Sequence, residues 1–129
     1  MQRVADLVDA ARGRIEQLTP DEVRAEVEAG TATLVDIRDV RELYREGKVP
    51  GAVHAPRGML EWWVDPTSEY HRDVFRPEQR YIFYCAHGMR SALATDAVQS
   101  MGYGNVAHLT NGFASWKDAG FDVEAVERR

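Results

Sequence analysis

The chain has 129 residues and a formal net charge of −5, from 16 Lys and Arg against 21 Asp and Glu. This length predicts one domain, and a content of 44% hydrophobic residues is enough for one core. The acidic balance disfavours nucleic acid or an anionic membrane as a partner. Because the sequence has no apolar run long enough to span a bilayer and no apolar signal-peptide core, we expect a cytoplasmic protein.

The chain contains a single cysteine, Cys85, and this count limits its chemistry. An intrachain disulfide, a paired-cysteine redox site and a multi-cysteine zinc site are excluded. His87 lies two residues further on, but no third ligand follows at a recognisable spacing. We therefore expect neither a metal nor a bound cofactor.

The first predicted elements are two helices. Apolar residues at a spacing of three to four predict a helix over 3–16, with the same face continuing to Leu18. Thr19 begins the second helix, where Pro20 takes the first helical position and Glu22 can close a capping box. Gly30 is expected to end it.

The middle of the chain alternates short strands and helices. Residues 34–37 form an apolar run typical of a buried strand, 39–46 read as a short helix, and 52–55 as a second strand. The segment 57–79 is the least regular, with one or two helical turns followed by a loop. We expect this segment to lie over the mouth of the active site.

The last part of the chain repeats the alternation more clearly. Residues 81–84 and 106–109 are predicted strands, followed by helices over 91–101 and 111–119. Continuous apolar strands that alternate with helices predict an α/β fold. We expect a parallel sheet of about five strands with helices on both faces.

The chemistry is expected in the segment that follows strand 81–84, which reads Cys85-Ala86-His87-Gly88-Met89-Arg90-Ser91. Ligands of open α/β sheets bind at the carboxyl ends of strands. Loop N–H groups, an arginine and a helix N-terminus together favour a thiolate over a thiol. The alternative, a buried cysteine that packs as a small hydrophobe, fits this context less well. The pattern therefore indicates a nucleophile assisted by backbone amides.

This loop resembles the active-site loop of rhodanese-like domains, which are sulfurtransferases whose cysteine carries a persulfide. Residues 34–54 resemble the first family signature and 101–116 the second, and the helix opening at Thr19 fits the usual start of the domain. The resemblance covers about 18–124 of one domain, 1–129, and leaves the helix over 3–16 as an additional element. The chain departs from the pattern at three positions outside the loop: Lys48, Asn111 and Asp122.

The resemblance implies a rhodanese-like fold and the thiosulfate sulfurtransferase type of activity. Cys85 would take sulfur from a small anionic donor such as thiosulfate and pass it to a thiol or to cyanide. The transferred sulfur would be bound by the loop residues Ala86, His87, Gly88, Met89 and Arg90. Arg90 would attract the donor or brace the loop by pairing with a carboxylate, and Arg57 is a candidate donor contact.

Two other functions stay open at this point. One is a non-catalytic docking or regulatory module. The other is a cysteine-based phosphatase or arsenate reductase, whose loop places its arginine six positions after the cysteine, whereas Arg90 is five after Cys85. Asp65 and Asp73 are candidate general acids for that chemistry. The physiological donor and acceptor and the oligomeric state are also open.

Several further residues receive mainly structural expectations. Asp36 and Arg38 are expected to be structural and to pair with neighbouring loops and with each other's helix. His54 is expected to be a satisfied core or rim histidine, and His87 to face solvent. The aromatic residues of the irregular segment are expected either to wall the site or to join the core; they are Trp62, Trp63 and Tyr70.

Overall fold

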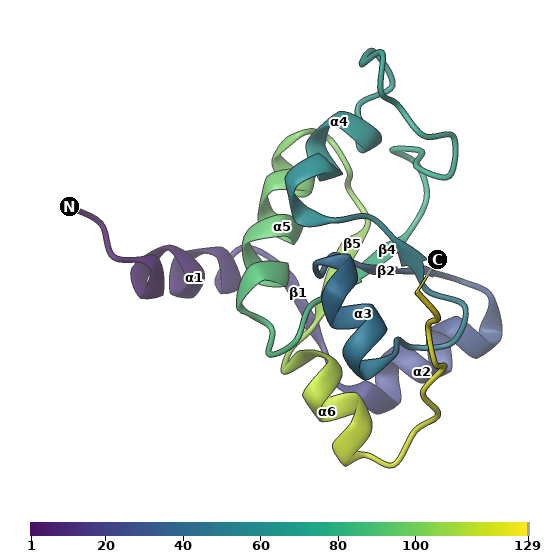
Figure 1. Cartoon of the computed structure of the whole chain (residues 1–129). Coiled ribbons are helices and arrows are strands. Elements are labelled where there is room, and N and C mark those ends of the chain that lie inside the picture. Colours follow the sequence, from purple (N-terminus) through teal and green to yellow (C-terminus); the bar gives the residue numbers. More distant parts are fainter. Residues whose placement is uncertain (129) are drawn as a thin grey trace.

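The computed structural model describes residues 1–128, and within them five parallel strands form one sheet in the order β1-β5-β4-β2-β3 (Figure 1). The strands are β1 (Glu16–Leu18), β2 (Thr33–Asp36), β3 (Val53–His54), β4 (Tyr81–Tyr84) and β5 (Val106–Leu109). The helical elements are α1 (Val4–Arg12), α2 (Pro20–Ala29), α3 (Val40–Glu46), the 3₁₀ turn η1 (Arg57–Met59), α4 (Leu60–Val64), α5 (Met89–Ser100) and α6 (Gly112–Asp118). The predicted α/β fold with a parallel sheet is confirmed.

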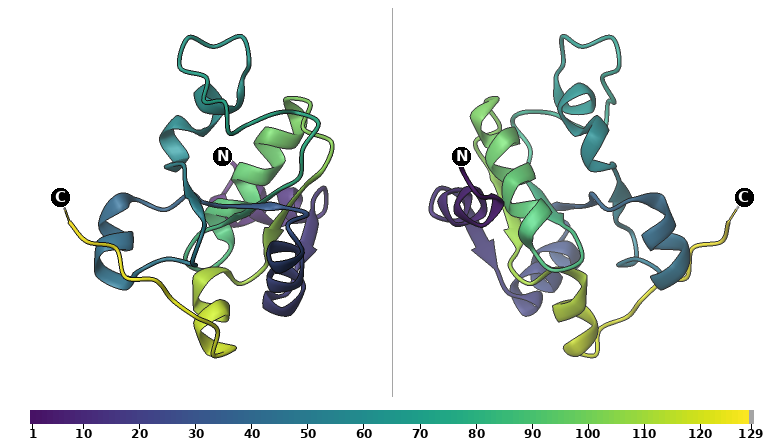
Figure 2. Two further views of the ribbon diagram at one scale, coloured as in Figure 1. Left: turned by 90° about the vertical axis from the view of Figure 1, so that its right-hand side faces the viewer. Right: turned by 60° about the vertical axis from the view of Figure 1, so that its left-hand side comes forward.

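Alternation along β4 divides the core into two halves, because successive strand residues point to opposite faces of a sheet. Tyr81, Phe83 and Cys85 lie in one apolar cluster, together with residues of α4 and α5. Ile82 and Tyr84 lie in the other, with residues of α2 and α6. Helices therefore cover both faces, as the views in Figure 2 show. None of the described helices is long and apolar enough to cross a bilayer.

The N-terminal helix is shorter than predicted. α1 ends at Arg12, and Gly13 caps it, so the expected helix over 3–16 is wrong beyond that point. Residues 16–18 instead form β1, an edge strand whose Leu18 lies beside Leu109 of β5. The partner strand supplies backbone hydrogen bonds that a helix would otherwise make internally, and this non-local gain overrides local spacing. α1 itself packs against α5, beside which it extends in Figure 1.

The start of α2 follows its local sequence signals closely. Thr19 accepts the backbone N–H of Glu22 at 3.2 Å, and the Glu22 carboxylate accepts the Thr19 N–H at 2.9 Å. The helix ends at Gly30, which takes a left-handed conformation with φ of 72°. The predicted capping box and the predicted end of the helix are both confirmed.

The part of the 57–79 segment that follows α4 lies away from Cys85, so the expectation that the segment covers the active-site mouth is wrong for these residues. The Tyr81 hydroxyl donates to the Val74 carbonyl at 2.7 Å and accepts the Arg76 N–H at 2.8 Å. Tyr103 donates to the Val64 carbonyl at 2.6 Å. Tyr81 begins β4, whereas Cys85 follows the end of β4. These bonds therefore hold the segment at the end of the strands opposite to Cys85. Of the aromatic residues considered for a wall, Trp63 packs against the core, and Trp62 and Tyr70 are exposed.

A buried ion pair joins the end of β2 to the crossover that follows it. Arg38 donates to Asp36 at 2.8 Å through Nη2, and both side chains are fully buried. The same Nη2 donates to the Gly47 carbonyl at 2.7 Å, and the guanidinium lies 4.3 Å from the centre of the Phe113 ring. The predicted structural role of both residues is confirmed, and their direct pairing is an addition from the structure. His54 also fits its rim assignment, since its Nε2 lies 2.7 Å from the Arg38 carbonyl oxygen.

Breaking this pair tests its contribution to stability. Arg38→Met leaves the buried Asp36 carboxylate without its cation, and we expect the free energy of unfolding to fall by about 3–5 kcal/mol. Urea denaturation measures the difference. Arg41→Met is the matched control, because Arg41 pairs with Asp39 at 3.0 Å on the exposed surface, and it should change stability little. Equal losses in the two variants would contradict the assignment.

Candidate active site

Cys85 lies in the turn from β4 to α5, where its sulfur accepts two backbone hydrogen bonds. The N–H groups of Gly88 and Ser91 lie 3.2 Å and 3.3 Å from Sγ. The residue is only 1% exposed. Amide donors stabilise negative charge on sulfur, and α5 directs its N-terminal end toward the loop. The sequence predicts donors from Ala86 to Arg90, and around the resting sulfur the structure shows Gly88 from that range and Ser91 one residue beyond it.

The curl of this loop depends on Gly88. Its φ of 87° is left-handed, and α5 begins at the next residue, two positions earlier than predicted. A Cβ at Gly88 would overlap the Thr110 carbonyl oxygen. The start of α6 also fixes the loop, because the Phe113 N–H donates to the Cys85 carbonyl at 2.8 Å. The loop is therefore held by backbone packing on the segment after β5.

Arg90 donates its hydrogen bonds to α3 and not to the sulfur. Its two terminal nitrogens donate to the Glu42 carboxylate at 2.8 Å and 3.0 Å, and its side chain is 43% exposed. The hydrogen bond from Arg90 lowers the pKa of Glu42 below its ordinary value. The structure thus shows the carboxylate pairing that the sequence predicts for Arg90.

The other predicted site residues do not converge on the sulfur. Arg57 donates to Glu61 at 2.6 Å, one helical turn along the same segment. His87 is exposed, as predicted, and so is Met89. Ala86 is partly buried and accepts the N–H of Ala114 through its carbonyl at 3.1 Å. In the described part of the chain, no group of three potential metal ligands comes together.

A buried row of hydrogen-bonded polar side chains lies beside Cys85, and the sequence did not predict it. The Sγ and the Ser91 hydroxyl are 3.5 Å apart, and Ser91 Oγ lies 2.9 Å from His108 Nδ1. His108 Nε2 lies 3.2 Å from Oε1 of Gln17 in β1. Ser91 and His108 are both fully buried. The available signal was a polar residue inside each of two otherwise apolar segments, but nothing in the sequence pairs them.

Burial and a nearby cation keep His108 neutral. Burial lowers the pKa of His108 to about 4, and the charge of Arg12 in α1 adds to the effect. Arg12 also reaches the loop itself, since its Nη2 lies 3.5 Å from the Gly88 carbonyl oxygen. Its buried Nε finds no hydrogen-bond partner among residues 1–128. The additional N-terminal helix thus places a cation at the active-site loop.

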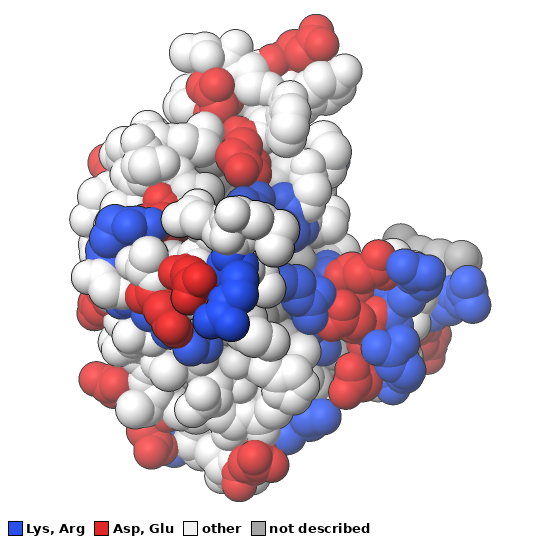
Figure 3. Space-filling view, turned by 90° about the vertical axis from the view of Figure 1, so that its left-hand side faces the viewer, with Lys and Arg blue, Asp and Glu red and all other residues white. Residues whose placement is uncertain are grey.

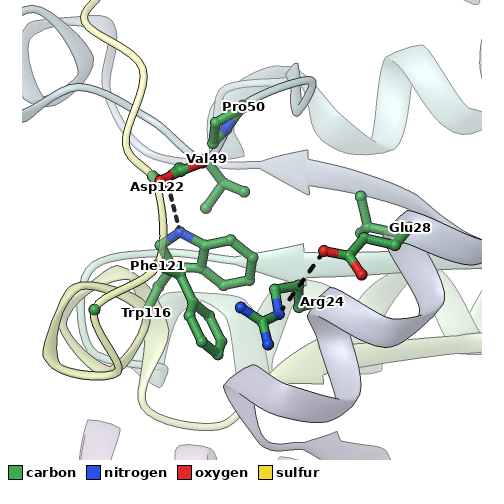
Figure 4. A pocket seen from close by; sticks show the side chains of 9 residues that line it. Arg24, Glu28, Val49, Pro50, Trp116, Phe121 and Asp122 are labelled. Atoms are coloured by element: carbon green, nitrogen blue, oxygen red, sulfur yellow. Dashed lines mark hydrogen bonds and ion pairs between the residues drawn. The ribbon is translucent and has the colours of Figure 1, made fainter.

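Two cavities border α6. One of about 80 Å³ borders the loop at Ala86 and His87 and includes Arg38 and Lys117. Another of about 250 Å³ lies between α2 and the end of α6, where Figure 4 shows Trp116 and Phe121 near Val49, with Arg24 at the side. Basic and acidic side chains are interspersed on the face shown in Figure 3.

The rhodanese-like domain family model matches residues 19–119, a stretch that includes the Cys85 loop and four of the five strands. The chain belongs to the rhodanese-like domain family. Thiosulfate sulfurtransferase/rhodanese-like domain-containing protein 3 of Mus musculus is 26% identical over 104 residues, covering 77% of this chain and 66% of that protein. The chain thus spans just under two thirds of the mouse relative.

Two further relatives match the chain along most of their length. Thiosulfate sulfurtransferase GlpE of Actinobacillus succinogenes is 25% identical over 108 residues, covering 84% of this chain and 89% of that protein. A solved structure from Rhodopseudomonas palustris is 43% identical with a TM-score of 0.92, and the match covers 96% of each chain. That protein is described as being of unknown function and a possible tyrosine phosphatase. The proteins to which this chain is similar therefore carry two different functional descriptions.

The role of Gly88 can be tested against a second left-handed glycine. Gly88→Ala adds backbone overlap with Thr110 to the strain of a left-handed residue, so the loop must move and withdraw its N–H from Sγ. We expect alkylation of Cys85 by iodoacetamide to slow at neutral pH and stability to fall. Gly30→Ala is the control, because its Cβ meets nothing and only the left-handed strain of about 1–2 kcal/mol remains. Unchanged alkylation in Gly88→Ala would contradict the assignment.

The low pKa of His108 makes stability depend on pH. In the unfolded chain His108 binds a proton near its ordinary value of 6.5, whereas in the folded protein it does so only near 4. The folding stability that depends on neutral His108 is fully present above pH 6.5 and is lost as the pH falls from 6.5 through 4. This loss amounts to about 3 kcal/mol. Denaturation of the wild type and His108→Gln at a series of pH values should show their stability difference changing by that amount, whereas parallel curves would contradict it.

Proposed function

We propose that this rhodanese-like protein is a sulfurtransferase that carries sulfur as a Cys85 persulfide. The observation that supports this most directly is the sulfur atom held by the amides of Gly88 and Ser91 at the start of α5. The same donors that stabilise a thiolate can stabilise charge on a bound sulfur. Family membership and the thiosulfate sulfurtransferases among the relatives support the same activity.

In the proposed first step, the Cys85 thiolate attacks the outer sulfur of a donor such as thiosulfate. A sulfur–sulfur bond forms at Sγ, the bond between the two donor sulfurs breaks, and sulfite leaves with that electron pair. In the second step, a thiol or cyanide attacks the terminal sulfur of the persulfide. The bond to Sγ then breaks, and its electron pair returns to Cys85 as the thiolate. No cofactor is required, because each step is a nucleophilic displacement at sulfur.

Positive charge for an anionic donor is available on both sides of the loop. Arg90 is half-exposed even though it is paired with Glu42, and Arg12 reaches the Gly88 carbonyl from α1. In this proposal the loop residues Ala86 to Arg90 bind the transferred sulfur. We retain Arg57 as a weaker candidate, because Glu61 already neutralises much of its charge.

A phosphatase is the second candidate, supported by the description of the Rhodopseudomonas palustris protein. A phosphate ester needs an arginine directed into the cradle to bind its oxygens. Here Arg90 donates both terminal nitrogens to Glu42 instead. This geometry favours transfer of a single sulfur atom over transfer of a phosphoryl group.

The intact mass of the protein after incubation with thiosulfate tests the proposal. We expect a gain of one sulfur atom that dithiothreitol removes, because a persulfide is reducible. Cys85→Ser should gain no sulfur, and cyanide added to the loaded wild type should release thiocyanate.

Two parallel reactions separate the alternatives. Iodoacetamide reports whether Cys85 is reactive, and para-nitrophenyl phosphate reports phosphatase activity. Labelling without a sulfur adduct would contradict thiosulfate as the donor. Hydrolysis of the ester that Cys85→Ser abolishes would favour the phosphatase, and a cysteine that neither reagent reaches would favour a docking module.

A further inference from the structure

Four side chains form a continuous hydrogen-bonded chain from the buried sulfur to the surface. It runs from Cys85 through Ser91 and His108 to Gln17, with steps of 3.5, 2.9 and 3.2 Å. The first three residues are almost fully buried, whereas Gln17 is exposed. These hydrogen bonds therefore connect a sulfur that is shielded from solvent with the edge strand β1.

Strand pairing holds this chain in place. Gln17 of β1 and Phe83 of β4 are the register partners of His108, so the three side chains share one face of the sheet. α5 covers the same face and places Ser91 over His108. The alignment thus follows from backbone registry rather than from flexible side chains.

The direction of each hydrogen bond follows from the acceptor at the surface end of the chain. Oε1 of Gln17 can only accept, so His108 Nε2 carries the proton. A neutral imidazole then has a bare Nδ1, which accepts the Ser91 hydroxyl proton. The remaining lone pairs of Ser91 accept the S–H of Cys85. Every hydrogen bond along these side chains then has one donor and one acceptor while Cys85 is a thiol. In this form the Ser91 hydroxyl donates to His108 and not to the sulfur.

We propose that Cys85 ionises through a shift of protons along these hydrogen bonds. Ser91 and His108 act as positioning residues, and the donor and the acceptor of each hydrogen bond change places. The inference deepens the proposed function, because it assigns how the nucleophile of that reaction loses its proton. It rests on the proposed function only for its role in turnover, since the ionisation itself needs no substrate.

The shift balances in protons and charge. The S–H proton passes to Ser91 Oγ, the Ser91 proton passes to His108 Nδ1, and the proton on Nε2 leaves to water as the exposed Gln17 side chain that faces it rotates. Cys85 becomes a thiolate, Ser91 stays a hydroxyl, and His108 stays neutral as the other tautomer. The Gln17 amide rotates so that its N–H donates to Nε2. The thiolate then has three donors: the Gly88 and Ser91 amides and the Ser91 hydroxyl.

The charged groups around the chain favour this outcome over a trapped imidazolium. Arg12 of α1 acts on His108, and its charge together with burial lowers the pKa of His108 to about 4. Arg90 acts on Cys85 from the start of α5, and Glu42 of α3 faces Arg90. Arg12 opposes a proton held on His108, and Arg90 interacts electrostatically with Cys85.

Nitrogen NMR of the His108 ring in the full-length wild type tests the proposal, because it distinguishes a protonated ring nitrogen from a bare one. Titration is followed in parallel by the ultraviolet absorbance of the thiolate. We expect the Nε2–H tautomer above about pH 4 while Cys85 is a thiol, and the Nδ1–H tautomer once the thiolate forms, with one common midpoint. Cys85→Ser should keep the Nε2–H tautomer throughout. A wild-type tautomer that stays constant while the thiolate forms would overturn the proposal.

Ser91→Ala removes the middle link but keeps the backbone N–H that reaches the sulfur. We expect its thiolate midpoint to rise by about one to two pH units, since the anion loses one donor, and its His108 tautomer to stop following that midpoint. Thr95→Val is the matched control: Thr95 is a buried hydroxyl on the same helix that donates to the Ser91 carbonyl. An unshifted midpoint in Ser91→Ala, or an equal shift in Thr95→Val, would overturn the assignment.

The titration contains no sulfur donor, so it separates this inference from the proposed function. A coupled tautomer change without a thiosulfate adduct would keep the proton shift and remove the sulfurtransferase assignment. An adduct without the tautomer change would keep the sulfurtransferase assignment and overturn the proton shift.

Discussion

A sulfur atom that is to hold negative charge inside a protein needs donors fixed around it before the charge forms. In this chain the donors are backbone N–H groups, and the backbone places them only because the loop after β4 curls tightly at Gly88. That curl is possible because Gly88 lacks a Cβ at its contact with Thr110. The parallel sheet supports the whole arrangement by placing the end of β4 beside the start of α5.

Ion pairs around the loop perform different tasks according to their burial. The pair of Arg38 with Asp36 is fully buried and ties the end of β2 to the following crossover. The pair of Arg90 with Glu42 is partly exposed and links α5 to α3. The first contributes mainly to the scaffold. The second braces the start of α5 against α3, and water screens its attraction more than that of the buried pair.

Local signals in the sequence predicted much of the fold. The capping box at Thr19, the end of α2 at Gly30 and the apolar strands β4 and β5 depend on residues close together in the chain, and all are confirmed. The same reasoning identified Cys85 from its place between a strand and a helix. β1 was missed because three residues with only one buried side chain carry no strand pattern, and its position is decided by pairing with β5.

The polar chain beside Cys85 shows the same limit at the level of single residues. Ser91 and His108 are 17 positions apart, and His108 and Gln17 are 91 apart, so only strand register brings them together. The segment after α4 failed as a predicted lid for a related reason. Its direction is decided by hydrogen bonds from Tyr81 and Tyr103, which no local pattern reveals.

The position of Arg12 and Gln17 has a consequence for how the domain is delimited. Both residues precede residue 19, where the match to the rhodanese-like family begins. A domain cut at the family boundary would keep the cysteine loop but lose the edge strand beside His108 and the cation beside Gly88. Two relatives with identical loops can therefore differ in the reactivity of their cysteine through what precedes the shared domain. Comparisons of activity across the family should include these upstream residues as part of the site.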